Sequence, residues 1–265
     1  MYTKIKHLFP SFLKVFLRKI IFYARKIYYT GNEYYCPICN KFARKFMKYG
    51  KNNDPIKKYK IISNGKRENC ICPNCFSKDR ERFLYIFFSY FQRKSFINKN
   101  SLILHFSPEK TLTNYFFKKY FQNYKTADFF DEKANYKIDL ENTLNHNKKY
   151  DLIICNHVLE HIHNDKVALK NINNLLNEGG YAVLLTPFSK VIEEDIYMGM
   201  SLSDQKQLEY YGQEDHVRIY SQKNLINKIQ NAGFNLKLMK LDEFSSIKKK
   251  MGLIDEERIF LAQKL

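Results

Sequence analysis

Hydrophobic residues gather in short runs along the second half of the chain, and polar turns separate these runs. Each run has the length and the apolar content of a strand buried on both faces. Segments with apolar positions three and four residues apart, which are typical of helices, alternate with the runs. This alternation predicts a doubly wound α/β sheet. The expected strands are residues 101–106, 125–129, 151–155, 181–185, 234–241 and 258–263.

The clearest βαβ unit spans residues 150–188. Its first strand, residues 151–155, is followed by a polar cluster at 156–165, and a second strand covers 181–185. We expect Gly179-Gly180 to end the intervening helix, because glycine is common just past a helix. The predicted buried face of that helix consists of Ala168, Ile172, Leu175 and Leu176. Parallel sheets bind ligands at the carboxyl ends of their strands, so the polar cluster is a candidate site.

Residues 1–30 contain a predicted amphipathic helix at 11–29. Its polar residues fall within an arc of about 140°, and the rest of its circumference is aliphatic or aromatic. The residues of the polar arc are Ser11, Lys14, Arg18, Lys19, Arg25 and Lys26. We favour docking of this helix on the protein itself or on a second subunit. The alternative is peripheral contact with a membrane surface.

Positive charge is concentrated at the amino-terminal end. The formal net charge is +18, and residues 1–60 hold 15 Lys and Arg against 2 acidic residues, whereas the remainder holds 30 against 25. A basic front end suits an anionic partner, although a general bias toward Lys, Asn, Ile and Tyr is an equal explanation. With no signal peptide and no apolar span of about twenty residues, we expect a cytoplasmic protein, with association at the inner membrane face as the alternative.

Two Cys-Pro-x-Cys motifs mark a separate small module at residues 31–77. Each motif presents two thiolates from a tight turn, and the two together match a closed tetrahedral zinc site. The predicted ligands of a structural Zn²⁺ are Cys36, Cys39, Cys72 and Cys75. Cys70 competes with Cys72 by position, but the geometry of the motif favours Cys72. Residues 78–97 are expected to form a linker helix to the main domain at 98–265.

Three segments of the main domain carry a family resemblance. Residues 150–188 resemble the region from strand 4 to strand 5 of class I S-adenosylmethionine (SAM)-dependent methyltransferases of the type 11-like kind. Residues 102–109 (LILHFSPE) and 212–218 (GQEDHVR) resemble the L-H-F-x-P-E and G-Q-x-D-H-x-R runs of a subgroup that carries a zinc ribbon. The resemblance implies a Rossmann-like methyltransferase sheet that binds SAM.

The resemblance also assigns the cofactor-binding residues. The glycine-rich loop after strand 1 is replaced here by His105, Ser107 and Glu109. An acid after strand 2 holds the ribose hydroxyls in the family, and Asp128 matches it, with Asp131 as the alternative. Asp139 after strand 3 is placed against the adenine. The residues that match the floor of the pocket, after strand 4, are Asn156 and His157.

The acceptor side is assigned to an insert at residues 189–220. His216, oriented by Asp215, is the candidate base, and His161 is a further catalytic candidate. Arg218 and Gln213 are expected to bind the acceptor. The alternatives are a lid held together by its own salt bridges and, for His161, a histidine packed beneath a loop.

Several functions are consistent with these features. The string from His157 to His161 matches the H-x-x-E-H metalloprotease pattern, but His157 falls at a strand end rather than on a helix. The preferred function is O-methylation of a small molecule, a sugar or a surface-polysaccharide precursor. One alternative is an RNA methyltransferase whose basic zinc module grips the phosphate backbone, which the absence of an N-P-P-Y motif after strand 4 disfavours. Another is a non-catalytic methyltransferase-like binding protein, because the strand 1 glycines are missing.

Overall fold

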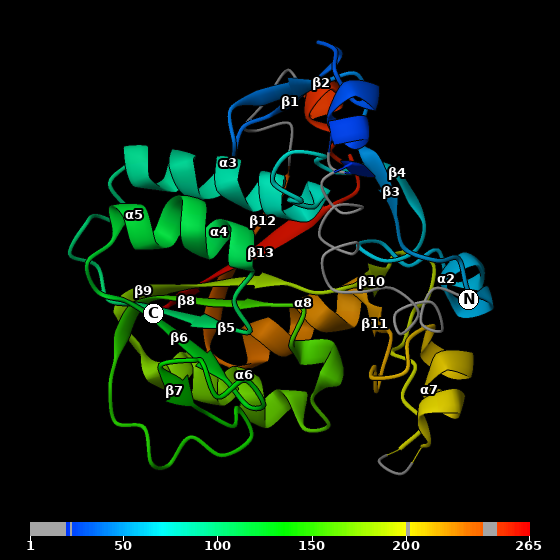
Figure 1. The fold of residues 1–265 in the computed structure, drawn as a ribbon. Helices are drawn as coiled ribbons and strands as arrows, with labels where there is room; N and C mark the ends of the chain where they lie inside the picture. The colour runs from blue at the N-terminus through cyan, green and yellow to red at the C-terminus, as the bar shows by residue number, and fades with distance from the viewer. Residues whose placement is uncertain (1–19, 22, 200–201, 241–247) are drawn as a thin grey trace.

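The computed structural model describes residues 20–21, 23–199, 202–240 and 248–265. A seven-stranded sheet forms its central layer, with helices on both faces (Figure 1). Helices α3 (Asp79–Arg93), α4 (Lys110–Leu112) and α5 (Lys118–Tyr120) lie on one face, together with the π-helix η2 (Thr113–Phe117). Helices α6 (Asp165–Leu175) and α8 (Gln222–Asn231) cover the other. This confirms the predicted α/β architecture.

The strand order is β12-β13-β9-β8-β5-β6-β7. Every strand is parallel to the others except β13, which is antiparallel to both of its neighbours. Strand β6 lies on one side of β5 and β8 lies on the other, so the strand order reverses between β5 and β8. The strands are β5 (Ile103–Phe106), β6 (Tyr124–Asp128), β7 (Tyr136–Lys137), β8 (Tyr150–Asn156), β9 (Leu176–Leu185), β12 (Phe234–Lys240) and β13 (Arg258–Lys264).

Alternate residues of the central strands supply two hydrophobic cores. In β8, Leu152 and Ile154 face the core shared with α3, whereas Ile153 and Cys155 face the core shared with α6 and α8. This two-sided burial explains the continuous apolar runs of the sequence. The first core is rich in aromatic side chains, each of which contributes about 1.5–3 kcal/mol by burial. They include Phe83, Phe87, Phe88, Phe91, Phe116 and Phe117.

The helix after β8 ends earlier than predicted. Helix α6 stops at Leu175, and Gly179-Gly180 lie inside β9 rather than at the end of the helix. The pairing of β8 with β9 jumps from Tyr150–Leu176 to Leu152–Tyr181, which leaves both glycines in a bulge. A Cβ on Gly180 would approach the carbonyl of Asn177 to 2.9 Å. The glycines therefore serve a tight bulge and do not cap a helix.

The cysteine-containing segment forms two short antiparallel pairs beside the sheet (Figure 1). They are β1 (Tyr34–Cys36) with β2 (Lys41–Ala43), and β3 (Met47–Tyr49) with β4 (Arg67–Ile71). Cys36, Ala43 and Phe46 belong to the same hydrophobic cluster as α3 and the sheet. We refer to the described residues 31–77 as the cysteine module. The module and the main domain share a core.

Helix α3 does more than link the two parts of the chain. The side chain of Arg82 is fully buried, and its guanidinium donates to the carbonyls of Ser77, Cys70 and Met251. Met251 ends a 3₁₀ turn, η5 (Lys248–Met251), just before β13. Arg82 thus ties the cysteine module to the carboxyl-terminal segment.

A short helix, α2 (Asp54–Lys58), extends from the cysteine module toward α7 (Asp204–Tyr211) of the insert, and the two lie side by side in Figure 1. Ile56, Ile61, Tyr211 and Ile219 form a small core of their own at this contact. The insert also pairs β10 (Phe188–Ser189) with β11 (Tyr220–Ser221). The amide of Ile62 donates to the carbonyl of Phe188, which fastens the module to the insert.

Most of the predicted helix at 11–29 lies outside the described residues. Residues 20–21 and 23–28 are helical. The end of this helix contacts the cysteine module, where the guanidinium of Arg25 lies 4.4 Å from the ring of Phe76 and Lys45 donates to the hydroxyl of Tyr28. Among the described helices, none combines the length and the hydrophobicity needed to cross a membrane.

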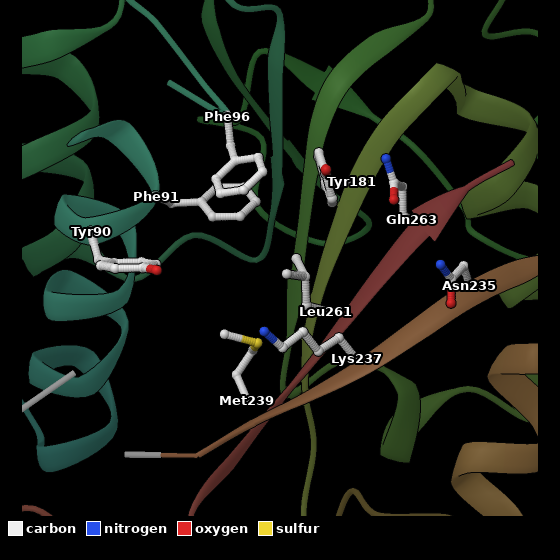
Figure 2. A pocket seen from close by; sticks show the side chains of 9 residues that line it. All are labelled: Tyr90, Phe91, Phe96, Tyr181, Asn235, Lys237, Met239, Leu261 and Gln263. Atoms are coloured by element: carbon white, nitrogen blue, oxygen red, sulfur yellow. The ribbon is translucent and has the colours of Figure 1, made fainter. Parts of the chain in front are cut away.

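A cavity of about 220 Å³ opens between α3 and the β12–β13 edge of the sheet (Figure 2). The aromatic rings of Tyr90, Phe91 and Phe96 line one side, and Lys237, Met239 and Leu261 line the other. Tyr181, in the middle of β9, also lines it. The cavity is therefore separate from the carboxyl ends of the parallel strands.

Candidate active site at the switch point of the sheet

Two strained residues mark the point where the strand order reverses. Ser107 follows β5 with a φ of 44°, and His157 follows β8 with a φ of 54°. A positive φ is uncommon outside glycine and is maintained only where the surroundings enforce it. Ser107 thus adopts a backbone conformation that glycine would favour in the corresponding loop. Both strained turns border the crevice in which doubly wound sheets bind ligands.

A cavity of about 490 Å³ lies at this edge of the sheet. Loops after β5, β6, β7 and β8 all contribute to its wall. Asp215, from the insert, also reaches it. The lining consists of Phe106, Ser107, Asp128, Phe129, Phe130, Ile138, Asp139, Leu140, Glu141, His157, Val158, His161, Ile162 and Asp215.

Asp128 joins the first two loops of the cavity. One carboxylate oxygen accepts the hydroxyl of Ser107 at 2.9 Å, and the other accepts the amides of Phe130 and Asp131 at 2.8 and 2.9 Å. Burial alone would raise the pKa of this carboxyl, but the amides of Asp131 and Phe130 outweigh burial and lower it. Asp128 is therefore an ionised, rigidly held acceptor.

The loop after β7 supplies a carboxylate between two apolar residues. Ile138 and Leu140 are buried, and both line the cavity on either side of Asp139. The carboxylate of Asp139 accepts the amide of Glu141 at 2.8 Å. A flat aromatic ligand would find apolar contact and a polar edge at this place.

His157 lines the cavity and has one ring nitrogen without a hydrogen-bond partner among the described residues. Its Nδ1 lies 3.1 Å from Glu160, whose second oxygen accepts the hydroxyl of Thr186 at 2.6 Å. Burial, the largest influence, lowers the pKa of His157 to about 4, so the ring is neutral at pH 7. A carboxylate can only accept, so Nδ1 carries the proton and Nε2 is an acceptor. This Nε2 is buried and has no partner among the described residues.

His105, Glu109 and Asn156 lie behind the cavity and are not part of its described lining. His105 is fully buried, with Nε2 2.8 Å from Glu109 and Nδ1 3.0 Å from the hydroxyl of Tyr124. The amide of Asn156 donates to Glu109 at 3.3 Å. The structure therefore separates these three from the other predicted cofactor residues, Ser107, Asp128, Asp139 and His157, which it brings together.

His161, Asp215 and His216 meet at the mouth of the cavity. The Nδ1 of His161 lies 2.8 Å from the carbonyl of Asp215 and 3.6 Å from its carboxylate. The ring of His216 packs edge-on against His161 with centroids 4.8 Å apart, and burial lowers the pKa of His216. The expectation that Asp215 orients His216 needs correction, because Asp215 contacts His161 and His216 is buried behind it.

Arg218 is directed into the protein, and Gln213 is directed toward the cysteine module. The Arg218 guanidinium is buried and donates to Asp165 at 2.6 Å and to the carbonyls of Ile162 and His163. These internal contacts hold the insert against α6 and keep Arg218 from an acceptor. Gln213 donates to Asn64 of the cysteine module at 3.0 Å.

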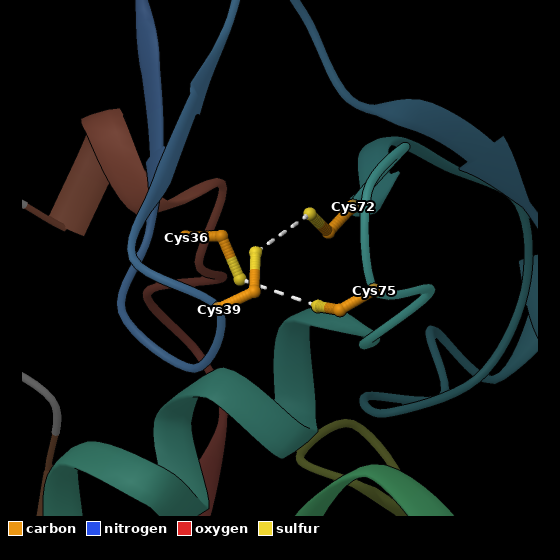
Figure 3. Close-up of side chains that lie close together, drawn as sticks. All are labelled: Cys36, Cys39, Cys72 and Cys75. Carbon is orange, nitrogen blue, oxygen red and sulfur yellow. Dashed lines mark hydrogen bonds between the residues drawn. The ribbon is translucent and has the colours of Figure 1, made fainter. Parts of the chain in front are cut away.

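The four cysteines of the two motifs converge (Figure 3). Cys36 lies 3.6 Å from Cys75, and Cys39 lies 3.8 Å from Cys72, measured between sulfur atoms. The hydroxyl of Ser77 is within 3.4 Å of Cys36 and 3.2 Å of Cys75. Cys70 stays outside the cluster and donates to Asp79 at 3.1 Å.

Comparison with known families identifies the class of protein. A family model described as a methyltransferase domain matches residues 36–238, and the chain therefore belongs to this family. Its strand order, with the last strand in the chain, β13, antiparallel, is that of a Rossmann-like sheet. Fold and family together define a class I SAM-dependent methyltransferase. No curated protein matches the chain.

Several solved methyltransferases are similar to the chain at low sequence identity. A SAM-dependent enzyme from Clostridium acetobutylicum is 15% identical, with a TM-score of 0.46, and covers 71% of this chain and 92% of its own. One from Archaeoglobus fulgidus is 14% identical, with a TM-score of 0.45 and coverages of 70% and 97%. The 1,6-didemethyltoxoflavin-N1-methyltransferase of Burkholderia thailandensis is 12% identical, with a TM-score of 0.41 and coverages of 69% and 77%.

The residues of this site fit SAM. The ionised Asp128 has one acceptor site left, on the oxygen that also accepts Ser107, and this site matches a ribose hydroxyl. Ile138, Asp139 and Leu140 match an adenine ring with its amino group. The unpartnered acceptor at His157 Nε2 matches a donor such as an ammonium group. A buried acceptor without a partner is unfavourable unless a ligand supplies one.

Sequence reasoning gave no role to Glu160 or Thr186 in holding His157. The signal available was Glu160 itself, three residues after His157 on the turn η3 (Leu159–His161). Thr186 lies after β9, and only the fold brings it to Glu160.

Proposed function

We propose that this protein transfers the methyl group of SAM to a hydroxyl oxygen of a small molecule or sugar. The carrying observation is the cavity at the switch point, where Asp128, Asp139 and His157 share one wall and the His161–Asp215 pair lies at the mouth. SAM supplies an electrophilic methyl group on a positively charged sulfur. The protein's own residues bind SAM, orient the acceptor and remove a proton from the reacting hydroxyl.

Binding is assigned to the loops of the sheet. Asp128 accepts a bond from a ribose hydroxyl, and the segment from Ile138 to Leu140 holds the adenine. Nε2 of His157 accepts a bond from the ammonium group, while Glu160 and Thr186 keep the ring in its neutral tautomer. Ser107 acts through Asp128, whose carboxylate it fixes.

Proton removal is assigned to His161. A hydroxyl oxygen gains a methyl group and loses its proton, and a positioned base accepts that proton as the new bond forms. His161 lines the cavity, whereas His216 is buried against it. The carbonyl of Asp215 accepts from Nδ1 of His161, which leaves Nε2 as the basic nitrogen.

The cysteine cluster is assigned to one structural Zn²⁺. A tetrahedron with Zn–S bonds of about 2.3 Å has sulfur atoms about 3.8 Å apart. Two of the separations here, 3.6 and 3.8 Å, agree with that geometry. All four positions are taken by sulfur, so this metal would support the fold and carry no reacting water.

Asp128→Ala tests the cofactor assignment by calorimetric titration of SAM. Loss of a charge-assisted acceptor costs about 1.5–3 kcal/mol, so we expect SAM affinity to fall by at least tenfold. Asp131→Ala is the matched control, because Asp131 lies three residues away and its carboxylate accepts only the amide of Lys133 among the described contacts. Unchanged affinity in Asp128→Ala, or no binding of SAM by the natural protein, would reject the proposal.

A further inference from the structure

A second cavity shares the lining residue Asp215 with the cofactor cavity. It has a volume of about 650 Å³, and Asp215 lines both cavities. One wall belongs to the cysteine module and comprises Tyr49, Gly50, Lys51, Asn53, Ile56 and Asn64. The opposite wall belongs to α7 and the loop after it, and comprises Asp204, Gln207, Leu208, Gly212, Gln213 and Glu214. We call this space the inter-wall groove.

The two walls are fastened together. Asn53 donates to the carbonyl of Gly212 at 2.8 Å, and Gln213 donates to Asn64 at 3.0 Å. Ile56 packs with Tyr211 in the small core beneath the groove. The groove is thus a preformed feature at the junction of the cysteine module and the methyltransferase domain, because buried contacts hold both of its sides.

The lining chemistry suits hydroxyl groups. Side-chain amides come from Asn53, Asn64, Gln207 and Gln213, and each amide can both donate and accept. The amide nitrogen of Asn64 is buried and lacks a partner within the described part of the chain, since its oxygen already accepts Gly65 and Gln213. A hydroxyl oxygen placed beside it would accept the missing bond.

The charge of the groove disfavours a polyanion. Three carboxylates, from Asp204, Glu214 and Asp215, face the groove, against one cation among the described lining residues, Lys51. Phosphates would be repelled by this excess of negative charge. Of the lysines and arginines of the amino-terminal segment, Lys51 alone is part of the described lining.

We propose that the inter-wall groove binds the methyl acceptor, an uncharged polyhydroxylated compound such as a neutral sugar, and that the cysteine module forms half of its binding site. One hydroxyl would reach His161 at Asp215, which lines both the groove and the cofactor cavity. This inference rests on the proposed function, because it takes the first cavity as the SAM site. It gives the cysteine module a role in substrate recognition as well as in stability.

Saturation-transfer NMR on the full zinc-loaded chain tests the groove without SAM. The probes are neutral mono- to trisaccharides of glucose, galactose, mannose and N-acetylglucosamine, with trigalacturonate and a ten-nucleotide RNA as polyanions. We expect at least one neutral sugar to bind and both polyanions to bind more weakly. Lys51→Ala, on the module wall, and Gln207→Ala, on the α7 wall, should each weaken sugar binding about three- to tenfold, as expected for one hydrogen bond.

Matched controls are Lys57→Ala on α2 and Gln205→Ala on α7, because both residues are exposed and neither is part of the described lining. Both should leave sugar binding within about twofold. The groove proposal is overturned if no neutral sugar binds, if either polyanion binds more tightly, or if Lys51→Ala has no effect. SAM titration of the same proteins separates the two proposals: lost SAM binding with intact sugar binding rejects the proposed function alone.

Discussion

At the scale of single residues, the choice of the catalytic base depends on the surroundings of each histidine at the site. Three histidines lie close together, but their surroundings differ. His157 is held by Glu160, and burial lowers the pKa of His157. His216 is buried, whereas His161 is partly exposed beside Asp215. Of the three, only His161 lines the cofactor cavity next to Asp215 and is also oriented by Asp215. A general base requires both access and orientation.

His161→Ala is expected to lower kcat by about 100-fold or more, in the range usual for loss of a general base. Affinity for SAM should stay within about twofold, because the assigned cofactor contacts lie on other residues. His163→Ala is a matched control two residues away, outside the described lining. Single-turnover rates with labelled SAM and the unmethylated sugar acceptor measure the effect. A variant His216→Ala that loses turnover while His161→Ala keeps it would contradict the assignment.

Glu257 predicts a pH dependence of stability. Burial raises the pKa of this carboxyl to about 7, from an ordinary value of 4.5, and Ser63 donates a hydrogen bond to it. The folded state therefore holds the proton more tightly than the unfolded chain. The free energy of unfolding should fall as the pH rises from about 4.5 to 7, by about 3 kcal/mol from this residue.

Urea unfolding near pH 4.5 and pH 8 measures that contribution. Glu257→Gln keeps the shape of the side chain and should reduce the difference in unfolding free energy between the two pH values. Glu256→Gln, at the exposed neighbouring position, should leave the difference unchanged. Burial also raises the pKa of Glu81 to about 7, so part of the dependence is expected to persist. An identical pH dependence in Glu257→Gln and the natural protein would disprove the assignment.

At the scale of elements, α2 and α7 define the inter-wall groove by packing closely. Gly212 ends α7 with a φ of 82°, in the left-handed region that glycine adopts most readily. A Cβ at this position would lie 2.7 Å from the side chain of Ile56 on α2. The glycine therefore serves both the end of the helix and the contact between the two walls.

Gly212→Ala should destabilise the protein by about 2–4 kcal/mol, because backbone strain and overpacking add. Gly179→Ala is the control: its φ is 73°, but a Cβ there meets no atom within 4 Å. The stability of that variant should fall only by the cost of the left-handed backbone conformation, about 1–2 kcal/mol. Thermal and urea unfolding of both variants give the comparison. Equal losses in the two would show that contact with Ile56 contributes nothing.

At the scale of the whole molecule, the cysteine module and the α/β domain share one hydrophobic core. Cys36, Phe46 and Cys72 share a hydrophobic cluster with α3 and the sheet, and Arg82 joins the module to the carboxyl-terminal segment. Loss of the module's structure would expose part of the main core. Stability of the module and of the domain should consequently be linked.

Cys72→Ser is expected to abolish binding of one zinc per chain and to lower the melting temperature of the entire protein in a single transition. Cys70→Ser should keep the zinc, because Cys70 contacts Asp79 outside the cluster. Zinc analysis and scanning calorimetry measure the two effects. A separate early transition for the module, with an unchanged main transition, would contradict the shared core.

Much of the fold could be predicted from the sequence because the signals are local. Strand runs, the helix at α3 and the paired cysteine motifs each lie within a short segment. The family resemblance singled out Asp128 and Asp139. The helix end at Leu175 was missed because a glycine pair serves a bulge as readily as a helix end. The placement of His105 behind the cavity was also missed. Side chains alternate between the two faces of β5, but the side on which His105 lies is known only once the sheet is known.

The sequence by itself determined the sheet, the cysteine motifs and the loops that carry the candidate site, because each depends on residues that are close together in the sequence. Only the tertiary structure decided which side chains meet. Asp215 lies against His161, Arg218 against Asp165, and Gln213 against Asn64 of the cysteine module. These partners are far apart along the chain, and short-range patterns of polarity contain no information about such contacts.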